Sequence, residues 1–241
     1  MPSTQDPGPV LSTSRLRLRP WCDDDLAPFA AMGADPAVMR HMPSLLDRAA
    51  SDALAGKLRA HFADHGFGLW AVDLVAPAPR PRSAPNTAPN TAPNTAPHTP
   101  LDTAPHTKPR TGAGPSFIGF IGFVGLSVPH FETPFTPCVE IAWRLAKRAW
   151  GQGYATEAAR AALDFGFTTL ELEEIVSFTI PANTASIRVM ERLGMSRDPA
   201  EDFDHPRVPR GHRLCRHVLY RLDRPTWRAK NPPREAPQRP Q

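Results

Sequence analysis

The stretch from Arg148 to Thr156 has the composition of a loop that binds phosphate groups. A predicted strand ends at Leu145, the basic Arg148 follows, and glycines at 151 and 153 stand just before a predicted helix. Glycine lets the backbone approach a ligand without a clash from Cβ, and the first turn of a helix offers free N–H groups and a partial positive charge. The spacing therefore predicts an anion-binding loop, suited to a pyrophosphate.

Two common phosphate loops do not fit this stretch. A P-loop requires Gly-Lys-Ser/Thr, whereas Gly153 is followed by Tyr154 and Ala155, and a dinucleotide fingerprint requires a third glycine where Thr156 stands. A second glycine series lies inside an apolar stretch and leads into no helix, so we interpret it as close packing or bulges. This series comprises Gly119, Gly122 and Gly125.

The elements that must position the loop alternate between strand and helix patterns. Their order, β-α-α-β-β-β-α-β-α-β, predicts an α/β (α+β) domain built around one sheet. Strands are expected at 14–20, 67–75, 117–128, 138–145, 175–180 and 212–222, and helices from 23, over 45–65, from 151 to about 169, and from Asn183 to Leu193. Asn183 is expected to cap its helix, and Gly194 to end it.

Proline-rich stretches divide the chain. Residues 76–116 contain three successive Asn-Thr-Ala-Pro repeats, which cannot bury enough apolar surface to offset the entropy of ordering. We predict a disordered insert at the tip of a hairpin, whose flanking strands pair across it. Residues 1–10 and 223–241 are predicted to be a disordered N-terminus and a disordered basic tail, so that the domain spans 11–222.

The charge distribution argues against nucleic acid as a sequence-specific partner. The net charge is +4, but the tail from Arg221 carries +4 and residues 76–116 carry +3, which leaves −3 elsewhere. No apolar run is long enough to span a bilayer, and the N-terminus has no apolar h-region. Cys22, Cys138 and Cys215 have neither disulfide-framework nor zinc spacing. We expect a cytoplasmic protein, monomeric or homodimeric, with no membrane partner.

Four segments in order resemble the GCN5-related N-acetyltransferase (GNAT) superfamily. Arg148-x-x-Gly151-x-Gly153 is similar to its Q/R-x-x-G-x-G/A signature, and Trp-Gly-Gln-Gly-Tyr-Ala-Thr-Glu-Ala (150–158) resembles the ribosomal-protein alanine and serine N-acetyltransferase (RimJ/RimL-like) branch. The other segments are 140–145, 183–195 and 202–222. The resemblance covers about residues 11–222 apart from the insert.

This resemblance implies a single GNAT-type domain whose mixed, mostly antiparallel sheet splays apart to admit acetyl-CoA, the co-substrate. Backbone amides of Gln152 to Thr156 would bind the pyrophosphate, and the edge of Trp143–Leu145 would pair with the pantetheine amides. The implied CoA-binding residues are Trp143, Leu145, Arg148, Gly151, Gln152, Gly153, Tyr154, Ala155, Thr156, Asn183 and Ser186. The implied reaction is direct N-acetylation of a primary amine, either a protein N-terminus or a small molecule.

Glu140 is the first candidate for the base that deprotonates the amine. It shares a strand face with Ala142, beside the expected position of the acetyl group, and apolar neighbours raise the pKa of a carboxylate. The alternative is a carboxylate that only pairs with Arg144 or orders the acceptor pocket. Rival acids precede the last strand, namely Glu201, Asp202 and Asp204.

The acid that protonates the leaving thiolate departs from the family pattern. Many members use a tyrosine at the position that Met190 fills here, and the chain has only Tyr154 and Tyr220. We favour Ser186 as the substitute; the alternative is a polar residue of the first helical turn without a catalytic role.

Other functions remain as competing hypotheses. A CoA-binding regulatory module without catalysis would explain the missing tyrosine, and an interaction protein could act through the insert and the tail. No metal site is predicted, because His205, His212 and His217 lack ligand spacing. The acids that suggest a cationic acceptor are Asp35, Asp47, Glu201, Asp202 and Asp204.

Overall fold

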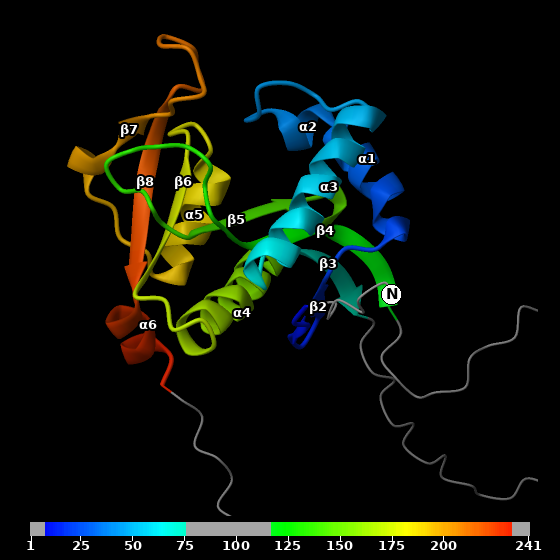
Figure 1. Ribbon diagram of the computed structural model, residues 1–241, viewed down its shortest axis with the longest axis horizontal. Helices are drawn as coiled ribbons and strands as arrows, with labels where there is room; N and C mark the ends of the chain where they lie inside the picture. Colours follow the sequence, from blue (N-terminus) through cyan, green and yellow to red (C-terminus); the bar gives the residue numbers. More distant parts are fainter. Residues whose placement is uncertain (1–7, 76–116, 233–241) are drawn as a thin grey trace, which may run out of the picture.

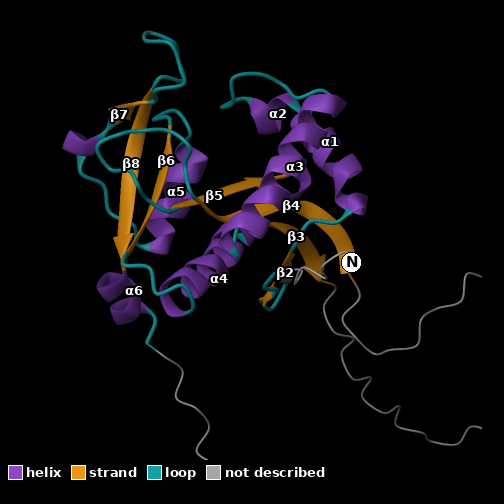
Figure 2. Cartoon of the chain, viewed as in Figure 1, coloured by secondary structure: helices purple, strands orange, loops and turns teal. Residues whose placement is uncertain are grey.

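Eight strands form one sheet in the order β1-β2-β3-β4-β5-β6-β8-β7 in the computed structural model, which describes residues 8–75 and 117–232 (Figure 1). The strands are β1 (Leu11–Ser12), β2 (Leu16–Arg19), β3 (Leu69–Val75), β4 (Phe117–Ser127), β5 (Glu140–Leu145), β6 (Glu174–Thr179), β7 (Phe203–Asp204) and β8 (Arg216–Asp223). The α-helices of this part are α1 (Leu26–Gly33), α2 (Pro36–Met39), α3 (Arg48–His65), α4 (Tyr154–Thr168), α5 (Thr184–Leu193) and α6 (Arg224–Lys230) (Figure 2). Short 3-10 turns are η1 (Asp23–Asp25), η2 (Lys147–Ala149) and η3 (Pro199–Glu201). The predicted mixed sheet with flanking helices is confirmed.

The sheet opens between β5 and β6. All other neighbours are antiparallel, whereas these two run parallel and pair only at Glu140 and Val176. The amide of Val176 donates to the carbonyl of Val139 (2.9 Å), and the Ser177 hydroxyl donates to the carbonyl of Ile141 (2.9 Å). Beyond this point β5 continues to Leu145 without a ladder to β6, so the edge of its second half faces the gap between the strands.

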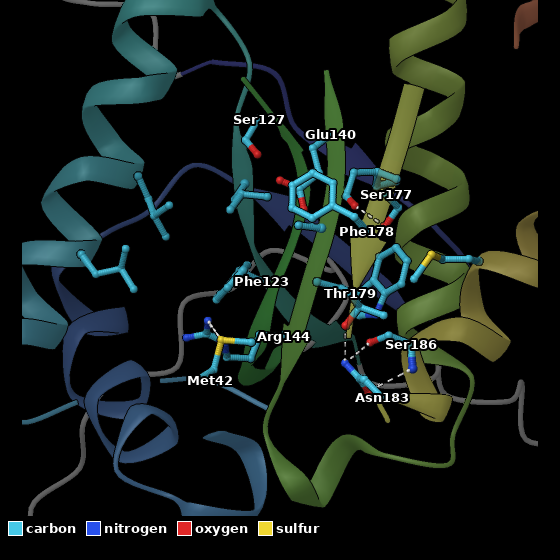
Figure 3. A pocket seen from close by; sticks show the side chains of 17 residues that line it. Met42, Phe123, Ser127, Glu140, Arg144, Ser177, Phe178, Thr179, Asn183 and Ser186 are labelled. Atoms are coloured by element: carbon cyan, nitrogen blue, oxygen red, sulfur yellow. Dashed lines mark hydrogen bonds between the residues drawn. The ribbon is translucent and has the colours of Figure 1, made fainter. Parts of the chain in front are cut away.

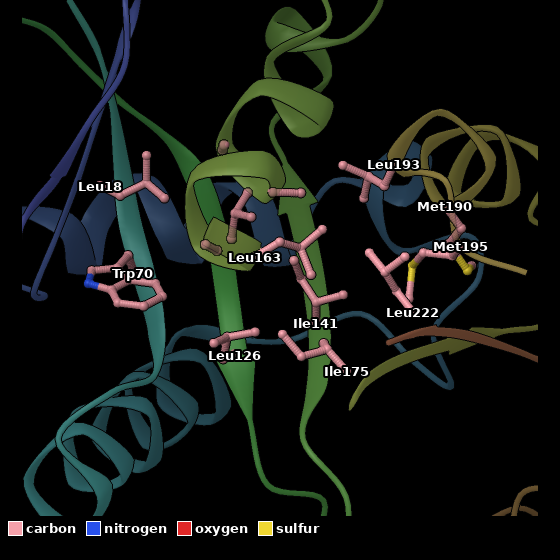
Figure 4. Close-up of a cluster of buried hydrophobic side chains, with 14 of the residues drawn as sticks. Leu18, Trp70, Leu126, Ile141, Leu163, Ile175, Met190, Leu193, Met195 and Leu222 are labelled. Carbon is pink, nitrogen blue, oxygen red and sulfur yellow. The ribbon is translucent and has the colours of Figure 1, made fainter. Parts of the chain in front are cut away.

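Helices cover both faces of the sheet. Leu163 and Phe167 of α4, Met190 of α5 and Trp227 of α6 pack on one face, in a core that includes Ile141 and the other side chains of Figure 4. On the other face α1 and α3 pack against β3 and β4, through a second buried cluster. That cluster comprises Trp21, Phe29, Met32, Ala55, Leu69, Ala71, Phe120, Phe123 and Ala146.

The strands on either side of the insert pair as expected. β3 and β4 are antiparallel from Leu69–Gly125 to Val75–Phe117, with two register shifts. The interpretation of the glycine series in β4 is also supported. A Cβ on Gly122 would meet the carbonyl of Arg144, and one on Gly125 would meet the carbonyl of Gly68. The insert itself lies outside the described residues.

Local signals missed several elements near the C-terminus. The tail predicted from 223 begins instead with α6, because Asp223 accepts a hydrogen bond from the Thr226 amide (2.7 Å) and Trp227 is buried against α4. The last long strand starts at Arg216 rather than at 212, and the short β7 was not predicted. In the N-terminal part the short elements β1 and α2 were also not predicted. Within residues 8–75 and 117–232, no helix combines the length and apolar character that crossing a bilayer requires.

Candidate active site

The loop between β5 and α4 presents backbone amides. Gly151 and Gly153 adopt left-handed φ values of 73° and 79°, which favour glycine. A Cβ at Gly151 would meet nothing within 4 Å, so backbone conformation and not space favours glycine there. The first amide of α4 that bonds a described protein acceptor is that of Glu157, which donates to the Gly153 carbonyl (3.0 Å). The amides just before it point out of a helix N-terminus, where an anion is stabilised.

Arg15, in the turn between β1 and β2, holds this loop in place. Its Nη1 donates to the carbonyl of Gln152 (3.0 Å), its Nε donates to Glu157 Oε2 (2.7 Å), and its guanidinium lies 4.7 Å from the ring centre of Tyr154. The C=O and N–H of a trans peptide point in opposite directions. A fixed Gln152 carbonyl therefore directs the Gly153 amide the other way.

Glu157 joins the β1–β2 turn to the start of α4. Thr13 Oγ1 donates to its Oε1 (2.5 Å), in addition to the Arg15 contacts. Partial burial alone would raise the pKa of Glu157, but the hydrogen bonds from Thr13 and Arg15 outweigh it and lower the pKa. Sequence reasoning missed this clamp, although an acid in the first turn of a helix was visible.

Two residues expected at the loop already have protein partners. The Arg148 side chain is exposed, and its Nη2 donates to the carbonyl of Phe120 on β4. Trp150 Nε1 donates to the Leu145 carbonyl (2.8 Å). The edge of Trp143–Leu145 was expected to pair with the pantetheine amides. The Leu145 carbonyl already accepts the Trp150 hydrogen bond, so it is less available for that pairing.

A cavity of about 270 Å³ lies where β5 and β6 part, and it brings the predicted residues together (Figure 3). β5 contributes Glu140 and Arg144, while Asn183 and Ser186 come from the opposite side, at the start of α5. The apolar wall comes from the turn after α2 and from α3, β3 and β4. It consists of Met42, Leu54, Leu58, Leu69 and Phe123.

Glu140 lies at the end of the cavity where β5 begins. It is paired across the β4–β5 ladder with Ser127, which also lines the cavity. Burial raises the pKa of Glu140 from 4.5 to about 8, and no described residue forms an ion pair with it. The alternative pairing with Arg144 is not seen; the two residues are four positions apart along β5, which separates their Cα atoms by about 13 Å.

A hydrogen-bond network orients the hydroxyl of Ser186. Asn183 Nδ2 donates to Ser186 Oγ (3.0 Å) and to Thr179 Oγ1 (2.9 Å), and Asn183 Oδ1 accepts from the Ser186 amide (3.4 Å). Asn183 therefore caps α5 as predicted. Ser186 Oγ accepts its hydrogen bond from the side-chain amide of Asn183. The hydroxyl proton of Ser186 is therefore available to another group in the cavity.

Of the other residues considered as proton donors to the leaving thiolate, Met190 has no proton to transfer, and both tyrosines lie outside the cavity. Met190 is buried and lines the cavity, but a thioether has no proton to give. Tyr154 contacts Arg15, and the Tyr220 side chain is buried in the main core; neither lines the cavity.

The rival acids form ion pairs with arginines away from the cavity. Glu201 pairs with Arg221 (2.8 Å), Asp204 lies 3.4 Å from Arg216, and Asp202 pairs with Arg197. His205 and His217 lie in an aromatic cluster, with ring centres 5.0 Å apart and ring planes tilted by 45°. Within the described ranges, no three His, Cys, Asp or Glu side chains gather as metal ligands.

Comparisons with known proteins agree on one family. A family model for the “Acetyltransferase (GNAT) domain” matches residues 15–196. The uncharacterized protein YkkB of Bacillus subtilis (strain 168) is 29% identical over 186 residues, which cover 77% of this chain and 84% of that protein. The FsC-acetyl coenzyme A-N(2)-transacetylase of Aspergillus fumigatus is 32% identical over 116 residues, or 45% of this chain and 47% of that enzyme. The solved acetyltransferase from Agrobacterium tumefaciens str. C58 is 26% identical with a TM-score of 0.57, over 89% of this chain and 94% of that one.

Proposed function

Because the chain belongs to the GNAT acetyltransferase family, we propose that the cavity between β5 and β6 is where an acetyl group passes directly to a primary amine. Membership makes the chain an N-acetyltransferase that uses acetyl-CoA. The alternative of a regulatory module without catalysis is not supported, since the matched model is that of an acetyltransferase domain.

The described residues fit the co-substrate. The amides of Gln152, Gly153, Tyr154, Ala155 and Thr156 would hold the pyrophosphate, with Gly151 shaping the turn and Arg148 adding charge nearby. On β5, the backbone of Trp143 at the open strand edge would pair with the pantetheine amides. The backbone of Leu145 would contribute less, because its carbonyl already accepts a hydrogen bond from Trp150. Bound acetyl-CoA supplies an activated acetyl group as a thioester.

Two residues of this chain would handle the protons. Glu140 would accept a proton from the acceptor ammonium, directly or through a water, and its raised pKa matches that task. After attack, the nitrogen loses a second proton, which Ser186 would relay through its hydroxyl to the leaving sulfur, so that the serine ends neutral, while Asn183 holds the oxygen in place. No covalent intermediate with the protein is involved, so the cysteines have no part as nucleophiles.

The observation that carries this proposal is the shared cavity. Glu140 and Ser186 line one cavity from opposite sides of the gap between β5 and β6. Glu140 lies on β5, the strand that leads into the amide-rich loop, and Ser186 lies in the first turn of α5. The acceptor is a primary amine, as a small molecule or a protein N-terminus. We further propose a cytoplasmic monomer or homodimer, in keeping with free thiols at Cys22, Cys138 and Cys215.

Calorimetric titration with acetyl-CoA tests the donor site. The double variant Arg148→Glu, Gly151→Asp places negative charge beside the loop, and we expect its affinity to fall about a hundredfold or more. Arg228→Glu, an exposed charge reversal on α6, serves as the control and should bind like the wild type. Wild-type protein without affinity, or a double variant with full affinity, would refute the donor site.

Ser186→Ala tests the proposed proton donor. The substitution removes the hydroxyl but leaves the Ser186 amide bonded to Asn183, so α5 should keep its cap. We expect kcat to fall by about tenfold to a hundredfold while Kd for acetyl-CoA changes little. Thiol release measures kcat, and Ser186→Thr should restore part of it. An unchanged kcat in the alanine variant would assign the serine a structural role only.

A further inference from the structure

Arg144 is a cation inside the cavity, and no acid of the described residues pairs with it. Its side chain lines the cavity from β5, on the same face as Glu140, and Figure 3 shows it beside Met42. Nη1 is buried without a hydrogen-bond partner among the described residues, and Nη2 reaches only the Met42 sulfur (3.1 Å). The guanidinium carbon lies 5.3 Å from the centre of the Phe123 ring.

This arrangement leaves the charge of Arg144 largely uncompensated. A thioether is a weak acceptor, and contact with an aromatic face offsets only part of the loss of water. Burial lowers the pKa of Arg144 to about 10, and no described carboxylate opposes that effect. A buried cation without a counter-ion strongly favours an incoming anion, which would form charge-assisted hydrogen bonds with the planar guanidinium.

The acids that suggested a cationic acceptor are engaged elsewhere. Asp35 accepts a hydrogen bond from the Ala37 amide (2.8 Å), and Asp47 accepts one from the Ala50 amide (2.7 Å), so both cap helices. Glu201, Asp202 and Asp204 form ion pairs with arginines. None of the five lines the cavity, and its only described acid is Glu140. The expectation of a cationic acceptor is therefore not supported.

The cavity has two chemically different ends. Glu140 and Ser127 lie at one end and Arg144 and Met42 at the other, about 13 Å apart along β5 at the level of the Cα atoms. The side of the cavity that α3 and β4 form is apolar, with Leu54 and Leu58 of α3 and Phe123 of β4. An amine and an anion joined by an apolar stem match this distribution.

We propose that the acceptor is an amine that also carries a carboxylate or a comparable anionic group, bound through Arg144. This inference rests on the proposed function, because it places the reacting amine near Glu140. Arg144 then selects the acceptor by its anionic end, and it discriminates against polyamines, whose second cation would face the guanidinium.

Calorimetry with three probes of equal chain length tests the selection without requiring turnover. The probes are 6-aminohexanoate, its neutral amide and hexylamine, each titrated into the CoA complex of the full chain. We expect the acid to bind at least about tenfold more tightly than the other two, as one charge-assisted hydrogen bond would provide. Shorter and longer homologues of the acid then locate the best separation between amine and carboxylate.

Arg144→Gln should remove the preference for the acid, and Arg144→Lys should retain part of it. The exposed Arg228→Gln on α6 removes the same net charge and should keep the full preference. A wild type that binds the acid no better than hexylamine overturns the proposal, as does an Arg144→Gln variant that keeps the preference. Titration of the same preparations with acetyl-CoA tests the donor site separately.

Discussion

At the scale of single residues, Glu140 combines burial with access to a cavity. Its carboxyl group faces the cavity, no described cation pairs with it, and burial raises its pKa to about 8. With this pKa the carboxyl group is mostly protonated at neutral pH, and a neutral carboxyl group forms no ion pair. In its ionised form it is well suited to accept a proton from an ammonium group whose pKa is not far away.

We predict that Glu140→Gln lowers kcat/KM by about a hundredfold or more, because the glutamine amide cannot accept the proton. In the wild type, kcat/KM should rise with pH through an apparent pKa near 8, and this limb should disappear in the variant. Thiol release across a pH series measures both. An unchanged profile would remove Glu140 from the role of base.

The same variant should be more stable than the wild type at neutral pH. Since the folded pKa of Glu140 lies above its ordinary 4.5, its contribution to stability is fully present below pH 4.5 and is lost as the pH rises through about 8. Glutamine does not titrate, so the gain in Tm should grow over this interval. The exposed Glu132→Gln is the control and should show no such trend.

At the scale of elements, the β1–β2 turn and the start of α4 act as one unit. Arg15 contacts both the Gln152 carbonyl and Glu157, and Thr13 also donates a hydrogen bond to Glu157. A loop that binds through backbone amides depends on the orientation of its peptide planes. The clamp therefore prepares the loop for an anion before it arrives.

We predict that Arg15→Met weakens acetyl-CoA binding by about tenfold, since the Gln152 peptide plane would no longer be fixed. Calorimetry measures the change. Arg48→Met, which breaks an exposed ion pair with Asp52 on α3, is the matched control and should leave the affinity as it is. Equal affinities for Arg15→Met and the wild type would show that the loop holds its shape alone.

At position 125, β4 lies so close to the backbone before β3 and to Trp70 that a residue with a Cβ does not fit. Gly125 has a φ of 159°, and a Cβ there would lie 2.6 Å from the Trp70 ring and meet the Gly68 carbonyl. We predict that Gly125→Ala lowers the free energy of unfolding by about 2 to 4 kcal/mol through overpacking and backbone strain. Gly56→Ala, in open space on α3, should instead stabilise by about 0.5 to 1 kcal/mol. Denaturant unfolding compares the two.

At the scale of the whole molecule, β3 and β4 form an antiparallel pair with two register shifts although residues 76–116 separate them in the chain. The ladder extends to Val75 and Phe117, so a tight turn could join the strands directly. We predict that replacing residues 77–115 by such a turn leaves kcat and Kd for acetyl-CoA within about twofold. Loss of binding in a folded variant would assign the insert a part in the site.

The sequence by itself determined the features that depend on neighbouring residues. Two glycines before a helix predict the amide-rich loop, Asn183 predicts the cap of α5, and alternation along 138–145 places Glu140 and Arg144 on one strand face. These signals are local, since turn geometry, capping and strand periodicity act over a few residues. The family resemblance rested on the same segments.

Tertiary structure alone decided which side chains share a cavity and which do not. Ser186 shares a cavity with Glu140 because β5 and β6 part after one residue pair. Within the described residues Arg144 forms no ion pair, while Asp35 and Asp47 cap helices and Glu201 pairs with Arg221. α6 forms where composition suggested a tail, because Trp227 finds a place in the core. Burial and pairing depend on residues distant in the chain, and a pattern of neighbours does not encode them.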